Sequence, residues 1–217
     1  MSRFRTIALA GLVAAAFAYP AAAVTVWDES ADGDLSGDQT APTVLALGSG
    51  TNSIAGTTQV GDLDFFTITV PDGASLTQLL LTSFESTDDL AFLAIESGPF
   101  ITDTGSAANL LGWMHPSAEF VGTDILDNLA AGEGALGFTA PLGPGTYTLW
   151  MQQLNPEPVG YGLDLIIEPV AVPEPPMSAL FALGLVALAV ARRLARVETV
   201  TLHCSGWSAS VAGRRPP

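Results

Sequence analysis

The sequence contains no lysine, and positive charge is missing from most of its length. Its seven basic residues are all arginines, at positions 3, 5, 192, 193, 196, 214 and 215. A nucleic-acid binder needs Lys or Arg to displace counterions from phosphates, and a P-loop enzyme or a kinase needs a lysine at its nucleotide phosphates. The central part of the chain lacks both, so we expect no nucleic acid among its partners.

Cysteine and histidine are nearly as scarce, which removes the usual catalytic arrangements. The single cysteine, Cys204, lies beside His203 near the C-terminus, without further metal ligands at a useful spacing. The other histidine, His115, has no Gly-x-Ser-x-Gly elbow before or after it. Because a hydrolase needs a nucleophile and a base, the sequence predicts a protein that is not an enzyme and has no catalytic residues.

Long apolar runs occur only at the two ends of the chain. Residues 1–23 have the parts of a secretory signal peptide, namely two arginines, an apolar stretch over residues 7–18, and small residues up to Ala23. Pro20 breaks a helix and argues against the alternative, a permanent membrane anchor. The sequence therefore predicts export, with cleavage near Ala23.

The second apolar run, Met177 to Ala191, is followed by Arg192, Arg193 and Arg196. As a helix it would reach roughly 22 Å, against about 30 Å for the hydrocarbon core of a bilayer. It has no polar face, which disfavours the alternative of a buried core helix. We expect a short transmembrane helix, with the flanking arginines on the cytoplasmic side.

Immediately before this run stands the sequence Val-Pro-Glu-Pro, with Pro173, Glu174 and Pro175. The order of this motif, an apolar helix and an arginine cluster over residues 172–196 resembles the PEP-CTERM sorting signal of Gram-negative bacteria. The resemblance implies that exosortase, a membrane-embedded processing enzyme, recognises the motif. It also implies that the bacterial inner membrane holds the protein at least transiently, before delivery to the cell surface or outside the cell. Family members usually end soon after the arginines, so residues 197–217 are interpreted as an atypical, nonfunctional tail.

Residues 24–171 remain as the exported body, with 20 acidic residues, no basic one and no cysteine. Short runs of β-branched, aromatic and aliphatic residues alternate with Gly and Pro turns, which predicts an all-β fold, a single antiparallel β-sandwich. The predicted strands are 64–70, 76–84, 90–95, 135–140, 146–154 and 161–170, the last two paired as a hairpin. Only residues 117–131 allow a short helical turn.

The body also resembles a known family through three motifs. These are Gly-Asp-Leu-Asp-Phe-Phe at 61–66, Leu-Gly-Pro-Gly-Thr-Tyr at 142–147 and Tyr-Gly-Leu-Asp-Leu at 161–165. They are similar to those of the bacterial pre-peptidase C-terminal domain, over roughly residues 25–170. The resemblance implies a jelly-roll-like sandwich that serves as an accessory module. From the residues themselves, Phe65 and Phe66 cannot both face one core, and the hydroxyl of Tyr147 is placed to tie a turn.

The acidic residues suggest a cation site. Asp32, Asp34 and Asp38 resemble the front half of a calcium loop, but position 12 would be Thr43 instead of a glutamate. Asp62 and Asp64 point to one side of a strand and could contribute to a looser site. Two interpretations stay open, Ca²⁺ bound by these aspartates or a solvated acidic turn, and no other cofactor is expected.

Two functions follow as expectations. The first is a non-enzymatic surface or extracellular-matrix protein, sorted by exosortase and, as the family resemblance implies, associated with exopolysaccharide or biofilm. The second is a carbohydrate-binding or adhesion module that uses Trp113, Trp150 or Tyr161 as a platform. An aromatic row exposed on one sheet would favour the second function, and burial of all three rings would remove it.

Overall fold

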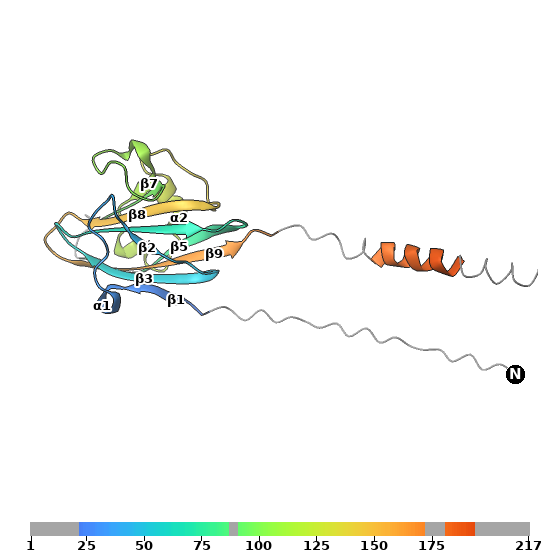
Figure 1. Cartoon of the computed structure of the whole chain (residues 1–217). Coiled ribbons are helices and arrows are strands. Elements are labelled where there is room, and N and C mark those ends of the chain that lie inside the picture. Colours follow the sequence, from blue (N-terminus) through green and yellow to red (C-terminus); the bar gives the residue numbers. More distant parts are fainter. Residues whose placement is uncertain (1–21, 87–90, 172–180, 194–217) are drawn as a thin grey trace, which may run out of the picture. The chain divides into compact units, whose positions relative to one another are not determined.

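The computed structural model describes residues 22–86, 91–171 and 181–193. The chain forms two compact units, one ending at Val170 and the other beginning at Ala171. The described part of the first unit is mostly strands in two sheets, as the sequence predicted, and Figure 1 shows them as stacked layers. We call this part the sandwich.

The four-stranded sheet has the strand order β1-β3-β9-β5, and the five-stranded sheet has the order β2-β4-β8-β6-β7. The strands of the first sheet are β1 (Val24–Asp28), β3 (Gly50–Thr58), β5 (Ala74–Glu85) and β9 (Val159–Pro169). Those of the second are β2 (Thr43–Leu45), β4 (Leu63–Val70), β6 (Ala91–Ser97), β7 (Leu110–Met114) and β8 (Gly145–Gln153). Four short helical turns connect them: α1 (Glu29–Asp32), η1 (Ala107–Asn109), η2 (Ala118–Phe120) and α2 (Leu126–Ala130).

The chain crosses repeatedly between the two sheets. Strands β3, β4, β5 and β6 alternate between them, and β9 and β8 are then inserted between earlier strands. Most pairs are antiparallel, as predicted, but β1 pairs with β3 and β2 pairs with β4 in parallel. In both pairs the N-terminal partner, β1 or β2, is the edge strand of its sheet.

The core between the sheets follows the two-residue period of the strands. Alternate residues of β4, β8 and β9 point inward, among them Phe66, Ile68, Leu149, Leu163 and Leu165, and all are fully buried. Burial of apolar surface at about 25 cal/mol per Å² is the main stabilising term for such a core. The chain has no disulfide in this unit to assist it, since its only cysteine is at position 204.

The five-stranded sheet is also covered on its outer face. A second apolar cluster contains Phe65 and Trp150 from β4 and β8, together with Leu110 at the start of β7 and Ile101 from the connection between β6 and β7. Phe65 therefore packs on the opposite side of β4 from Phe66, and both rings are buried. This explains why β4 reads as a nearly continuous apolar run instead of a clean alternation.

Two details of the strand prediction were wrong. Residues 146–154 and 161–170 do not form a hairpin, because β8 lies between β4 and β6 in one sheet while β9 lies between β3 and β5 in the other. Residues 135–140 are not a strand. Leu136 and Gly137 donate backbone hydrogen bonds to Leu110 and Leu111, so this segment lies irregularly beside the start of β7.

Two local predictions were confirmed. The hydroxyl of Tyr147 donates a hydrogen bond to the carbonyl of Gly143 at 2.9 Å and ties the turn before β8. Residues 117–131 contain the short helical turns η2 and α2, and α2 buries Leu126 and Leu129.

In the second unit, residues 181–193 are helical. The predicted transmembrane segment was 177–191, and its first four residues lie outside the described part of the chain. Among the described residues, no helix combines the length and apolar character that a membrane crossing requires.

Candidate cation site

The strand that follows the Gly-Asp-Leu-Asp motif carries a carboxylate into the interior. Asp64 is the second residue of β4, and the strand period gives it the same orientation as Phe66, toward the core. Its side chain is 0% exposed. A carboxylate buried at the end of an apolar core is costly unless it is paired, protonated or bound to a metal.

The segment after β1 covers this end of the sandwich. Asp28 caps α1 by accepting a hydrogen bond from the backbone N–H of Ser30, and Gly33, at φ +93°, lets the chain turn back after one helical turn. The carboxylate of Glu29 accepts hydrogen bonds from the backbone N–H of Thr57 at 2.6 Å and of Leu35 at 3.2 Å. Glu29 thus fastens this segment to β3.

These elements bring three carboxylates together. Glu29, Asp34 and Asp64 each offer an oxygen, and these oxygens all lie within 4.8 Å of one another. Asp64 is buried, Glu29 is half-buried and Asp34 is exposed, so the group runs from the core to the surface. We call these three residues the acidic cluster.

The two oxygens of Asp64 have different surroundings. Oδ2 accepts a hydrogen bond from the hydroxyl of Tyr161 at 2.8 Å, across the interface between the two sheets. Oδ1 is buried and has no hydrogen-bond partner among the described residues. A buried acceptor without a donor costs about 1–3 kcal/mol, and more when it is charged.

Burial raises the pKa of the Asp64 carboxyl to about 8. The hydrogen bond from Tyr161 opposes this rise, and the negative charges of Glu29, Asp62 and Asp34 add to it. Burial likewise raises the pKa of Glu29, against the lowering effect of its backbone hydrogen bonds. The pKa of Tyr161 is also raised, first by burial and then by the charge of Asp64.

A hard divalent cation fits this set of ligands. Calcium prefers oxygen ligands at about 2.3–2.6 Å, so that two ligands of one ion lie at most about 5 Å apart. The spacing of the acidic cluster satisfies this limit. The unpartnered Oδ1 of Asp64 is the kind of atom that a cation would satisfy, and no lysine or arginine lies between Thr6 and Ala191 to do so instead.

The aspartates proposed from the sequence do not all gather here. Asp62 is half-buried, and its pKa is raised by this burial and then by the charge of Asp34. Asp32 accepts a hydrogen bond from the backbone N–H of Asp28, and Asp38 accepts two from Thr40. The hydrogen bonds from Thr40 lower the pKa of Asp38. Asp32 and Asp38 therefore serve local turns.

Glu29 was missed by sequence reasoning. It lies 35 residues before Asp64, and no spacing rule relates a short helical turn to the start of a distant strand. The sequence held only an indirect signal for Glu29. It is an acidic residue in the first turn of a capped helix. Because the segment has no basic residues, its carboxylate has few partners other than backbone N–H groups or a cation.

The other residues singled out in the sequence lie elsewhere. His115 contacts the carbonyl of Ala91 through Nδ1 at 2.7 Å and packs edge-on against Phe92 and Trp113. Arg192 and Arg193 lie in the helix of the second unit and are its last described residues. Residues 173–175, which contain the sorting motif, and Arg196 lie outside the described residues.

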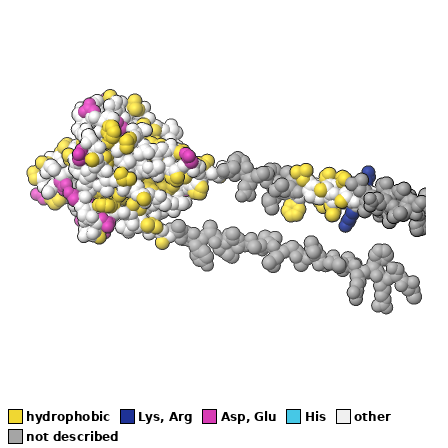
Figure 2. Space-filling model, viewed as in Figure 1, with side chains coloured by type: hydrophobic (Ala, Val, Ile, Leu, Met, Phe, Trp, Pro, Cys, Tyr) yellow, Lys and Arg dark blue, Asp and Glu magenta, His cyan; other side chains and the backbone are white. Residues whose placement is uncertain are grey.

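The three rings of the suggested carbohydrate platform do not share one surface. Tyr161 is 2% exposed and belongs to the core, whereas Trp113 and Trp150 lie on the outer side of the five-stranded sheet. Figure 2 shows one face of the molecule, on which acidic side chains are scattered over the sandwich among apolar and neutral polar surface.

Comparison with known proteins gives little further guidance. No family model and no curated protein matches the chain. Among solved structures, PliG of Salmonella Typhimurium, a periplasmic lysozyme inhibitor of g-type lysozyme, is similar at 15% identity and a TM-score of 0.32, over 58% of this chain and 98% of that one. PliG of Aeromonas hydrophila is similar at 14% identity and a TM-score of 0.29, over 58% and 96%. At these TM-scores the likeness carries no argument about function.

Proposed function

We propose that this protein is an exported, non-enzymatic surface or extracellular-matrix protein of a Gram-negative bacterium, whose sandwich is stabilised by a bound divalent cation, calcium. The single observation that supports the cation is the acidic cluster, in which the buried carboxylate of Asp64 has one oxygen without a hydrogen-bond partner among the described residues. The acidic cluster offers no nucleophile paired with a base, which suits a structural site better than a catalytic one.

Export and sorting are supported by the sequence at the two ends. The predicted signal peptide directs the body out of the cytoplasm, and the membrane holds the precursor while exosortase processes it next to Pro173, Glu174 and Pro175. Two prolines keep this segment extended, so that its backbone is accessible to a processing enzyme. Outside the cell, where calcium reaches millimolar levels, even a modest affinity suffices.

Thermal melting with calcium tests the cation. If calcium binds the folded state alone, the protein gains about 2.7 kcal/mol at a hundred times the Kd, and the melting temperature rises by about 5 to 10 °C. Asp64→Asn keeps an acceptor for Tyr161 but removes the charge, and it should abolish the rise. Asp72→Asn, an exposed aspartate in another turn, should leave the rise intact. No rise at millimolar calcium would refute the site.

Processing of a Glu174→Ala variant tests the sorting. We expect the variant to accumulate as unprocessed precursor in the membrane fraction. Glu168→Ala is the matched control, because it removes an exposed glutamate six residues earlier and should be processed normally. Normal delivery of the Glu174→Ala protein would overturn the sorting proposal and leave the cation proposal untouched.

A further inference from the structure

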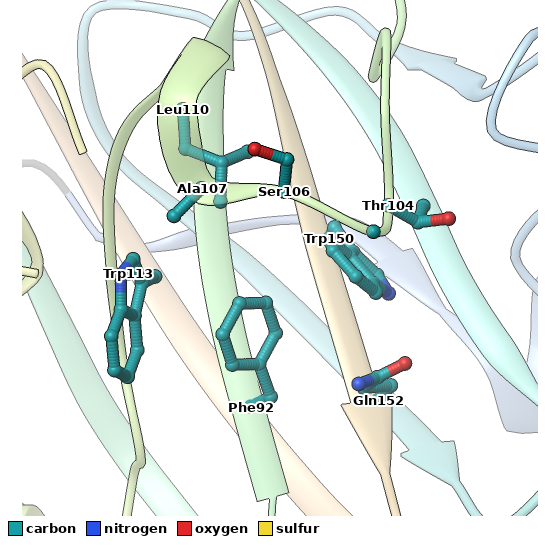
Figure 3. A pocket seen from close by; sticks show the side chains of 9 residues that line it. Phe92, Thr104, Ser106, Ala107, Leu110, Trp113, Trp150 and Gln152 are labelled. Carbon is teal, nitrogen blue, oxygen red and sulfur yellow. The ribbon is translucent and has the colours of Figure 1, made fainter. Parts of the chain in front are cut away.

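The outer face of the five-stranded sheet carries a hollow that neither the cation site nor the sorting signal uses. Its volume is about 260 Å³, and it is lined by Phe92, Trp113, Trp150 and Gln152 from three adjacent strands and by Thr104 and Ser106 from the connection beside them. Figure 3 shows the ring of Phe92 between those of Trp113 and Trp150, with the Gln152 side chain beside Phe92 and Trp150.

The strand register explains why this hollow exists. Ala94 of β6 pairs with Trp113 of β7 on one side and with Trp150 of β8 on the other, so a small residue separates two large rings. Phe92 lies two residues along β6 on the same face, directly opposite Gln152. The register of the three paired strands therefore places Phe92, Trp113 and Trp150 side by side on one face of the sheet.

The rings are held firmly in place. Phe92 stacks on Trp113 with centroids 5.6 Å apart, and it meets Trp150 edge-on at 4.8 Å. The indole N–H of Trp113 donates to the carbonyl of Glu133 at 2.9 Å, and Phe65 stacks on Trp150 from the side of the second apolar cluster. A site built from locked side chains on strands loses little entropy when a ligand binds.

The lining indicates an uncharged ligand with both apolar and hydroxyl surface. It contains no acidic or basic side chain, and its polar groups are hydroxyls and an amide. The sandwich has no basic residue and 20 acidic ones, so an anionic polymer would be repelled.

We propose that this hollow binds one pyranose unit of a neutral polysaccharide. The C–H face of a sugar ring carries partial positive charge and packs on the negative face of an aromatic ring, while its hydroxyls suit amide and hydroxyl partners. The volume lies just below the range of about 300–1,000 Å³ for drug-sized ligands, which suits a single ring. This inference rests on the proposed location outside the cell, where such polymers occur.

Affinity electrophoresis of the full-length protein in gels that contain soluble neutral polysaccharides tests the inference. The probes are galactomannan, hydroxyethyl cellulose and dextran, with alginate as the anionic comparison. We expect retardation by at least one neutral probe and none by alginate. Trp113→Ala and Gln152→Ala should each weaken binding about tenfold or more. Phe100→Ala, an exposed aromatic outside the lining, should change nothing.

A Trp113→Phe variant controls for the loss of folding that Trp113→Ala could cause. It keeps an aromatic ring in the hollow and should retain most of the affinity. The binding of two variants is compared only where their melting temperatures show that both are folded under the conditions of the assay. The inference is overturned if no neutral probe binds, if alginate binds equally well, or if folded Trp113→Ala and Gln152→Ala proteins bind as the parent does. None of these results bears on calcium binding or on processing at Glu174, so the two proposals fail separately.

Discussion

At the scale of single residues, the stability of the protein depends on the state of one buried carboxylate. Asp64 lies at the end of the core, with Tyr161 on one oxygen and no partner among the described residues on the other. Two solutions are available to such a group, a proton or a cation. The neighbouring charges of Glu29 and Asp34 disfavour the bare anion. In the proposed site, protons and calcium would therefore compete for the same carboxylate.

We predict that the calcium-free protein becomes less stable as the pH rises from about 5 to about 8. Folded Asp64 keeps its proton up to a pKa of about 8, whereas an unfolded aspartate releases it near 3.8, so the folded state binds more protons between these values and loses stability as the pH rises through them. The raised pKa of Glu29 acts in the same direction.

Melting in a chelator across this pH range measures the effect. Asp64→Asn should be markedly flatter than the parent, and Asp72→Asn should follow the parent. Addition of calcium should restore most of the stability of the parent at pH 8. A parent protein that melts at the same temperature throughout would show that Asp64 does not carry the dependence.

A second residue-scale prediction concerns Gly56 in β3. A Cβ at this position would lie 2.6 Å from Oη and 2.7 Å from Cζ of Tyr161, whose ring is buried and hydrogen-bonded to Asp64. We expect Gly56→Ala to destabilise the protein by about 1–3 kcal/mol and to weaken calcium binding, because the tyrosine must shift away from Asp64. Gly143→Ala is the control, since no atom lies within 4 Å of its added Cβ. Equal melting temperatures for the two variants would contradict this account.

At the scale of elements, the strands rich in apolar and β-branched residues were predictable and their partners were not. Strands β4, β5, β6, β8 and β9 were expected within a few residues of their bounds, because short runs of β-branched, aromatic and aliphatic residues between turn residues leave few alternatives. The sequence Gly-Thr-Asn-Ser-Ile-Ala-Gly-Thr-Thr of β3 has little such signal. It becomes a strand because it pairs with β9 along its whole length.

The element that completes the proposed cation site is the segment from α1 to Leu35. It is joined to β3 mainly by Glu29, whose carboxylate also belongs to the acidic cluster. We predict that calcium slows amide hydrogen exchange in residues 29–35 and at Thr57, because a bound ion holds Glu29 in place. Peptides from β6, on the other sheet, should exchange equally with and without calcium. Unchanged exchange in residues 29–35 would place any bound calcium elsewhere.

At the scale of the whole molecule, charge is distributed by segment. The net charge of −15 combines arginine-bearing ends with a sandwich that has 20 acidic residues and no basic ones. If both ends are removed, the mature protein is more acidic than its precursor. Its exposed charges interact mainly within about 8 Å at physiological salt, so local groups such as the acidic cluster matter more than the total.

If the proposed export and sorting are right, the mature protein isolated from the organism that produces it begins at Val24 and ends near Pro173–Pro175. The intact mass of the protein reports the processing of both termini at once. A digest of the same protein should show no peptide that contains Cys204. A strain without exosortase should retain the C-terminal segment while still losing the first 23 residues. A mature protein that begins at Met1 or that keeps residues 197–217 would contradict the corresponding processing step.

The sequence by itself determined the strand-rich character of the sandwich, the turn tied by Tyr147, and the absence of positive charge over its whole length. These depend on local periodicity, turn chemistry and composition, which need no knowledge of distant residues. Only the tertiary structure decided that β8 and β9 belong to different sheets, that Glu29 joins Asp34 and Asp64, and that Trp113 and Trp150 flank Ala94. These are contacts between segments far apart in the chain, and burial and strand register, which no local pattern encodes, select them.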